Sequence, residues 1–194
     1  MDTFEYAMVL VAVVIGLGLA HLLSGLGQAI NRLQDSQQPI RIETAYLCWV
    51  GYMFLYLVQF WWWEYQFHTL GVVWSVYLYY FIITYAVIIY LLTTVLVPWQ
   101  MQGVTSALDQ LIAKRYWFFG LLLVATAIDI VDTFLKGADW GQRPGYIAFV
   151  TGQSLASVLG MLSENKRVHL AVALVMFSWQ LIYSLVDLQV LGAF

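Results

Sequence analysis

Long apolar runs alternate with short polar segments along the chain, and this pattern predicts six membrane-spanning helices. A helix crosses the hydrocarbon core of a bilayer with roughly 20 apolar residues. The expected helices cover residues 5–27, 44–66, 72–97, 116–136, 146–163 and 168–190. Transmembrane strands need segments of roughly ten residues with alternating polarity, whereas these runs are longer and continuously apolar. We therefore predict an all-α integral membrane protein, with one transmembrane domain over residues 1–194 and short loops.

The composition supports a membrane location. The chain is 62% hydrophobic and 10% charged, whereas about 25% of the residues of a soluble domain are charged. No block of basic residues suggests nucleic acid as a partner. The start, MDTFEY, lacks the positive segment of a cleavable signal peptide, so we expect the first run to be retained as a helix. The expected partners are the lipid bilayer and either further copies of the chain or other membrane subunits.

The distribution of Lys and Arg predicts the orientation. Cytoplasmic loops of membrane proteins are enriched in these residues. Six of the eight lie in or beside the first, third and fifth loops: Arg32, Arg41, Lys114, Arg115, Lys166 and Arg167. We therefore expect loops 28–43, 98–115 and 164–167 in the cytoplasm and both termini outside.

The long third loop contains a candidate short helix. Ser106 is a typical N-cap residue, and Leu108, Leu111 and Ile112 would share one apolar face. An ordinary cytoplasmic linker is the alternative.

The fourth predicted helix carries charges on one face. Asp129, Asp132 and Lys136 follow at helical spacing, and Asp132 precedes Lys136 by four residues, which favours an ion pair. Asp129 has no such partner in sequence, and a carboxyl at this depth costs on the order of 2.5–3.5 kcal/mol to insert. It therefore either binds and releases a proton, as a proton-coupled carrier needs, or fixes helix packing by a hydrogen bond.

Polar residues on the last three helices predict a polar seam, because lipid cannot satisfy their hydrogen bonds. The seam comprises Asp129, Asp132, Asp187, Gln180, Gln153, Ser157 and Ser184. Glu64, near the outer end of the second helix, is a possible relay or packing residue. No cofactor is predicted, although a divalent cation at Asp129, Asp132 and Asp187 is an open alternative. The aromatic stripe on the second helix (Tyr52, Tyr56, Gln59 and Trp63) and the tyrosines of the third are expected to serve packing and interface anchoring.

The first helix contains small residues and a histidine. Gly16, Ala20 and Ser24 recur every four residues and predict a close helix contact. His21 lies on an adjacent face, where it serves either a hydrogen bond across the contact or a proton relay. Haem ligation would need a second histidine level with His21, and neither His68 nor His169 meets that condition.

The first half of the chain resembles known proteins in three features. These are F-E-Y near the start, G-L-x-L-x-H-L-L over residues 16–23, and the Trp run at 61–63. With them the chain resembles a group of small bacterial multi-pass inner-membrane proteins. The resemblance implies a bacterial inner-membrane location and assigns neither an activity nor a site residue.

Three functions fit this sequence. The polar seam favours a small, homo-oligomeric transporter or channel for a proton, a cation or a small molecule. The short loops and glycine-faced helices fit a non-catalytic subunit or scaffold of a larger membrane complex. A membrane enzyme acting on lipid or quinone would use the outer carboxylates, but no catalytic motif indicates a reaction.

Overall fold

The described part of the chain is helical throughout. The computed structural model describes residues 3–33, 39–100 and 103–186, and within them no strand occurs beyond one isolated bridge between Arg41 and Ser106. The helices are α1 (Thr3–Leu33), α2 (Thr44–Glu64), α3 (Gln66–Thr69), α4 (Val76–Leu96), α5 (Ala107–Ala113), α6 (Arg115–Lys136), α7 (Ala138–Gly141), α8 (Pro144–Leu162) and α9 (Lys166–Val186). The predicted all-α class is confirmed at this level.

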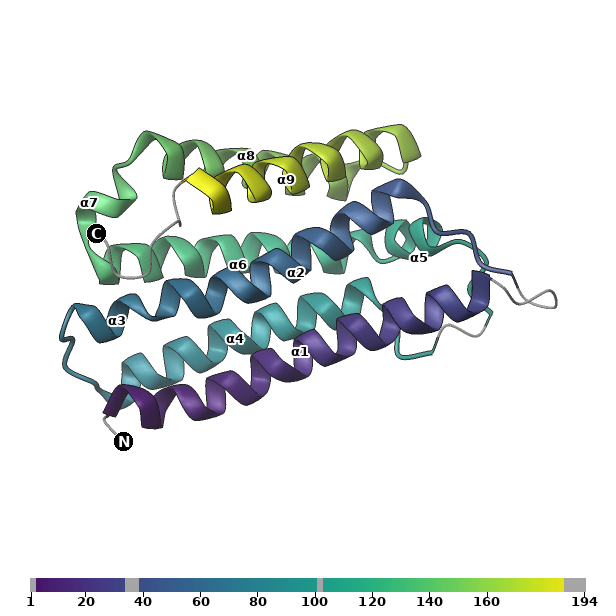
Figure 1. The fold of residues 1–194 in the computed structure, drawn as a ribbon. Helices are drawn as coiled ribbons and strands as arrows, with labels where there is room; N and C mark the ends of the chain where they lie inside the picture. The colour runs from purple at the N-terminus through teal and green to yellow at the C-terminus, as the bar shows by residue number, and fades with distance from the viewer. Residues whose placement is uncertain (1–2, 34–38, 101–102, 187–194) are drawn as a thin grey trace.

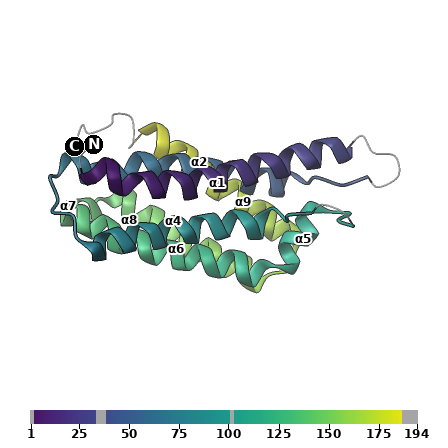
Figure 2. The same ribbon diagram turned by 90° about the horizontal axis from the view of Figure 1, so that it is seen from below.

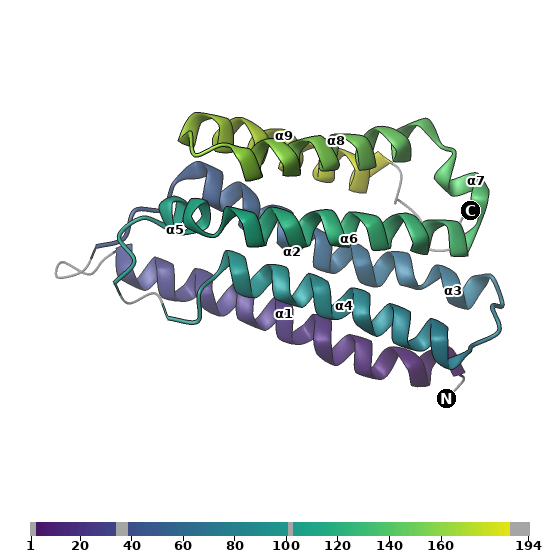
Figure 3. The same ribbon diagram turned by 180° about the vertical axis from the view of Figure 1, so that it is seen from behind.

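The six long helices form two layers of three. One layer contains α1, α2 and α9, and the other contains α4, α6 and α8 (Figures 1 and 2). Figure 3 shows the second layer in front, with α6 between its two neighbours. The helices α2 and α6 are therefore the central members of their layers. Side chains that join these two helices lie in the middle of the bundle.

Five of these helices are long and apolar enough to cross a membrane: α1, α4, α6, α8 and α9. The helix α2 is not among them, since its many Trp and Tyr residues lower its mean hydropathy. It nevertheless buries more of its surface than a peripheral helix, because it contacts α1, α4 and α9. A central helix has little contact with lipid, so its side chains can be more polar.

Two helix ends, in α1 and α4, differ from the prediction by several residues. The helix α1 continues to Leu33, beyond the expected end at 27, because residues 28–33 are mostly good helix formers without Gly or Pro. At roughly 1.5 Å per residue, its 31 residues exceed the thickness of a bilayer core. The helix α4 begins at Val76 rather than 72, where Ser75 caps it by accepting from the Leu78 amide at 3.2 Å. The expected end of the last helix, at 190, lies outside the described residues.

The short helix of the third loop is confirmed as α5. Ser106 caps it by accepting a hydrogen bond from the Asp109 amide at 3.1 Å. Glu43 accepts from the Ser106 hydroxyl and from the Leu108 amide, which ties the first loop to the start of α5. The apolar face, with Leu111 and its neighbours, is buried against α2 and α6. Protein, rather than lipid, covers this face.

The fifth loop joins the same end of the bundle. The guanidinium of Arg115 lies 2.5 Å from Glu164, and Lys166 lies 2.6 Å from Asp109 on α5. The first, third and fifth loops therefore meet at one end, while α3 and α7 lie at the other (Figure 1). Consecutive long helices therefore run in opposite directions through the bundle.

The close contact of α1 involves a different face from the predicted one. A Cβ on Gly16 would meet nothing within 4 Å, whereas one on Gly25 would lie 1.9 Å from a methyl of Val97. Beside Gly25, the Nε2 of His21 donates a hydrogen bond to the Val97 carbonyl at 2.7 Å. The predicted hydrogen bond of His21 is confirmed. The face with Gly16, Ala20 and Ser24 is exposed, so the prediction of a close contact there is wrong within this chain.

Candidate functional site

A buried ion-pair cluster joins the ends of α2 and α6. The ammonium of Lys136 lies 3.0 Å from the carboxylate of Glu64 and also contacts the carboxylate of Asp132. All three side chains are fully shielded from solvent. The predicted pair of Asp132 and Lys136 is confirmed, and Glu64 joins it from α2. These acids gather at the end of the bundle that contains α3 and α7.

Aromatic side chains surround this lysine. The indole N–H of Trp63 donates to Asp132 at 2.9 Å. The Lys136 ammonium lies 5.0 Å from the centre of the Trp63 ring and 4.4 Å from that of Phe67. Cation–π attraction of this kind is stronger where water is excluded. Two carboxylates and two rings thus satisfy the only ammonium of the cluster.

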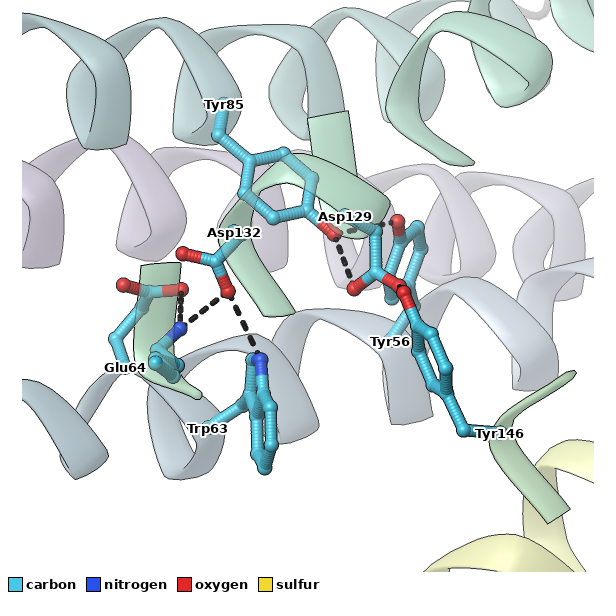
Figure 4. A network of polar contacts seen from close by, with 8 residues as sticks. Tyr56, Trp63, Glu64, Tyr85, Asp129, Asp132 and Tyr146 are labelled. Atoms are coloured by element: carbon cyan, nitrogen blue, oxygen red, sulfur yellow. Dashed lines mark hydrogen bonds and ion pairs between the residues drawn. The ribbon is translucent and has the colours of Figure 1, made fainter. Parts of the chain in front are cut away.

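Asp129 has different partners, although it lies one turn from Asp132. Its Oδ1 accepts a hydrogen bond from the Tyr85 hydroxyl on α4 at 3.1 Å, and its Oδ2 accepts from Tyr146 on α8 at 3.0 Å. The hydroxyls of Tyr85 and Tyr56 lie 3.0 Å apart, which extends the network to α2. Figure 4 shows the two groups next to each other, with Glu64 and Trp63 beside Asp132 and the three tyrosines around Asp129.

The charges of the site do not balance. Glu64, Asp129 and Asp132 carry three carboxylates, whereas Lys136 supplies one ammonium. With all four groups ionised, the site has an excess of two negative charges. The hydroxyls that contact Asp129 are neutral, so hydrogen bonds stabilise its charge without compensating it. Unpaired charge in apolar surroundings is costly, and the site therefore favours the arrival of a proton or a cation.

A pocket opens beside Asp129, between α2, α4, α6, α8 and α9. About 50 Å³ of it admits the centre of a water-sized sphere, which is room for about four water molecules. The residues that line it are Tyr56, Gln59, Phe60, Trp63, Tyr85, Asp129, Thr133, Tyr146, Phe149, Gln180 and Tyr183. Seven of these eleven are aromatic and only Asp129 is charged, so the pocket is an aromatic enclosure with one acidic group.

The other predicted seam residues make two separate contacts with α2. Gln153 accepts from the Tyr52 hydroxyl at 2.5 Å and donates to the Thr126 hydroxyl at 2.6 Å. Gln180 is hydrogen-bonded to Gln59. The hydroxyls of Ser157 and Ser184 each donate to a carbonyl of their own helix, at 2.8 Å. Asp187 lies outside the described residues.

The seam therefore differs from the predicted one in its membership. It includes α2 and α4, whereas the sequence placed it among the last three helices alone. Tyr52, Tyr56 and Trp63 were expected to serve packing, yet each has a polar partner in the network. The signal was present in their spacing, which puts these hydroxyl and indole groups on one face of α2. Sequence alone does not show which helix that face meets.

The described residues contain no group of three His, Cys, Asp or Glu side chains that could hold a metal ion. Asp132 contacts Lys136, and Asp129 accepts from Tyr85 and Tyr146. Asp187, the third residue of the divalent-cation alternative, lies outside the described residues. His21 bonds to Val97, while His169 bonds to the Ser163 carbonyl at 2.9 Å.

No family model matches the chain, and no curated protein or solved structure matches it. The class of protein is therefore described from the fold and the site alone. Over the described residues it is an all-helical bundle in which five helices are apolar enough to cross a membrane, with an acidic, aromatic pocket inside.

Proposed function

We propose that the protein is a small six-helix membrane transporter that carries a proton or a small cation through the site around Asp129. The excess of negative charge carries this proposal, because Asp129 has only neutral partners while Lys136 is shared by Glu64 and Asp132. A cation transporter alternates between a loaded and an empty state. A negative charge inside it attracts the cation, and the bound cation then neutralises that charge. The aromatic pocket beside Asp129 gives such a cargo a place to bind.

Six membrane passes are part of the proposal. The five apolar helices supply five passes, and the central position of α2 supports a sixth for a helix that other helices cover. The basic residues support cytoplasmic loops 28–43, 98–115 and 164–167 with both termini outside. A bacterial inner membrane is the proposed location.

Flux measured with reconstituted protein tests this function. Liposomes that contain the protein and an internal pH indicator are exposed to a membrane potential, and proton entry is followed. We expect Asp129→Asn to reduce the protein-dependent flux at least about tenfold, because the charge that attracts the cargo is gone. Asp109→Asn makes the same change on the exposed face of α5 and should leave the flux unchanged. Undiminished proton flux in Asp129→Asn would contradict the proposal.

A second candidate function is a subunit of a membrane complex. The face of α1 with Gly16, Ala20 and Ser24 is exposed, and small residues at this spacing allow a second helix to approach closely. Native mass spectrometry of the gently extracted protein distinguishes the two. A homo-oligomer favours the transporter, whereas other polypeptides in the same particle favour the subunit.

A further inference from the structure

The pocket beside Asp129 has a chemistry more specific than that of a general cation site. Aromatic rings attract organic cations through their negative faces, and aromatic residues form most of this lining. Ions such as Mg²⁺ and Ca²⁺ require about six oxygen ligands. The lining offers one carboxylate, and its other oxygens belong to two neutral amides and five hydroxyl groups, so a doubly charged ion would meet only one compensating charge.

A buried acceptor belongs to one of the lining residues. The Nε2 of Gln59 donates to the backbone carbonyl of Gln180 at 3.4 Å, so its Oε1 is the acceptor of the pair. The side-chain Nε2 of Gln180 donates to that Oε1. This orientation leaves the Oε1 of Gln180 buried without a hydrogen-bond partner among the described residues. A buried acceptor without a donor costs about 1–3 kcal/mol, so a ligand with an N–H group would satisfy it.

Asp129, in the lining of the same pocket, adds acceptor capacity. Each of its oxygens accepts one tyrosine hydroxyl, and a carboxylate has about four lone-pair sites. The two remaining sites suit a second N–H group of the same ligand. Lys136 does not fill this role, because its ammonium is bound by Glu64 and Asp132.

The size of the space limits the ligand. With about 50 Å³ open to the centre of a water-sized sphere, the pocket holds roughly three to five non-hydrogen atoms. A large lipophilic cation would extend beyond this space. A short alkyl chain fits between rings such as Tyr56, Phe60 and Phe149, where burial of each methylene is favourable by about 0.8 kcal/mol.

We infer that the pocket binds a small primary alkylammonium ion, whose N–H groups donate to Asp129 and Gln180 while its alkyl chain packs against the aromatic lining. This inference rests on the proposed function and names the substrate class of the same site. The ammonium supplies the positive charge that Asp129 lacks and the donor that Gln180 lacks. A metal cation supplies the charge but no donor, and a neutral molecule supplies at most the donor. Inorganic ammonium meets both conditions but has no alkyl chain to pack against the aromatic lining.

Calorimetric titration of the purified protein in detergent tests the inference without any measurement of flux. Propylammonium is the probe, and three further compounds isolate its features: 1-propanol lacks the charge, tetramethylammonium lacks N–H groups, and sodium lacks the alkyl chain. We expect propylammonium to bind, tetramethylammonium to bind at least about tenfold more weakly, and 1-propanol and sodium to give no saturable heat. Equal binding of 1-propanol or of tetramethylammonium would overturn the inference.

Two variants with matched controls locate the binding site. Asp129→Asn should abolish propylammonium binding, and Gln180→Leu should weaken it about tenfold. Asp109→Asn and Gln142→Leu make the same changes at exposed positions and should bind like the wild type. Wild-type affinity in both Asp129→Asn and Gln180→Leu would overturn the assignment. If either variant does not fold, the ligand series on the wild-type protein decides.

The outcomes separate this inference from the proposed function. Propylammonium binding that depends on Asp129, without flux of any cation in liposomes, would uphold the ligand and contradict the transporter. Proton flux that depends on Asp129, without propylammonium binding, would uphold the transporter and contradict the ligand.

Discussion

The ammonium of Lys136 lies 3.0 Å from a carboxylate oxygen of Glu64 and ties the end of α6 to the end of α2. These residues are 72 positions apart in the chain. The same ammonium contacts Asp132, so one cation joins two acids from the two central helices. Because the Lys136 ammonium is paired with these two acids, the hydrogen-bond donors that contact Asp129 are neutral hydroxyls. The packing of α2 against α6 therefore creates the acidic character of the pocket.

Loss of the lysine should destabilise the bundle strongly. In Lys136→Met, the buried carboxylates of Glu64 and Asp132 lose their cation, and breaking a buried pair typically costs about 3–5 kcal/mol. Lys166→Met is the matched control, because its pair with Asp109 is half exposed and should contribute less than about 1 kcal/mol. Thermal unfolding in detergent compares the variants. Equal midpoints for both would show that the buried cluster contributes nothing to stability.

The indole N–H of Trp63 should contribute measurably to stability. Trp63→Phe keeps a ring beside Lys136 but removes the donor to Asp132, and we expect a loss of about 1–3 kcal/mol in the free energy of unfolding. Trp61→Phe alters a neighbouring, exposed ring and should change this free energy by less than about 0.5 kcal/mol. Chemical unfolding in mixed micelles provides the comparison. A larger effect at Trp61 would argue against the hydrogen bond.

The two glycines of α1 should respond to the same substitution in opposite directions. Gly16→Ala places its methyl in open space, and alanine favours a helix by up to about 1 kcal/mol. Gly25→Ala places its methyl against Val97, where overpacking costs about 1–3 kcal/mol. Thermal midpoints of the two variants measure the difference. If Gly16→Ala were the more damaging one, that face of α1 would be covered by a partner.

The pair of Asp109 and Lys166 should make a small contribution to stability that depends on pH. The hydrogen bond from Lys166, with help from Ser106, lowers the pKa of Asp109 below its ordinary value of 3.8. The contribution is therefore present above that value and is lost as the pH falls through the folded-state pKa. We expect the wild type to be slightly more stable than Asp109→Asn at pH 7, and we expect this difference to shrink as the pH falls below 3.8. A difference that grows as the pH falls would contradict this sign.

The sequence alone was enough to predict the class of protein and much of its local structure. Continuous apolar runs of about 20 residues have few alternatives to helices, because every backbone polar group in lipid needs an internal partner. The pairing of Asp132 with Lys136 and the cap at Ser106 depend on residues within one turn, so spacing predicts them. The hydrogen bond of His21 was also expected, although its acceptor, Val97, was not.

Only the tertiary structure decided which helix faces meet. Helical spacing places Tyr52, Tyr56 and Trp63 on one side of α2, yet it does not show that α6 and α8 lie opposite that side. The same limit applies to Glu64, whose partner is 72 positions away, and to Gly16, whose face stays exposed. Periodicity fixes the direction of a side chain relative to its own helix. The arrangement of six such helices depends on packing between faces that are distant in the chain, and this arrangement brings the pocket around Asp129 together.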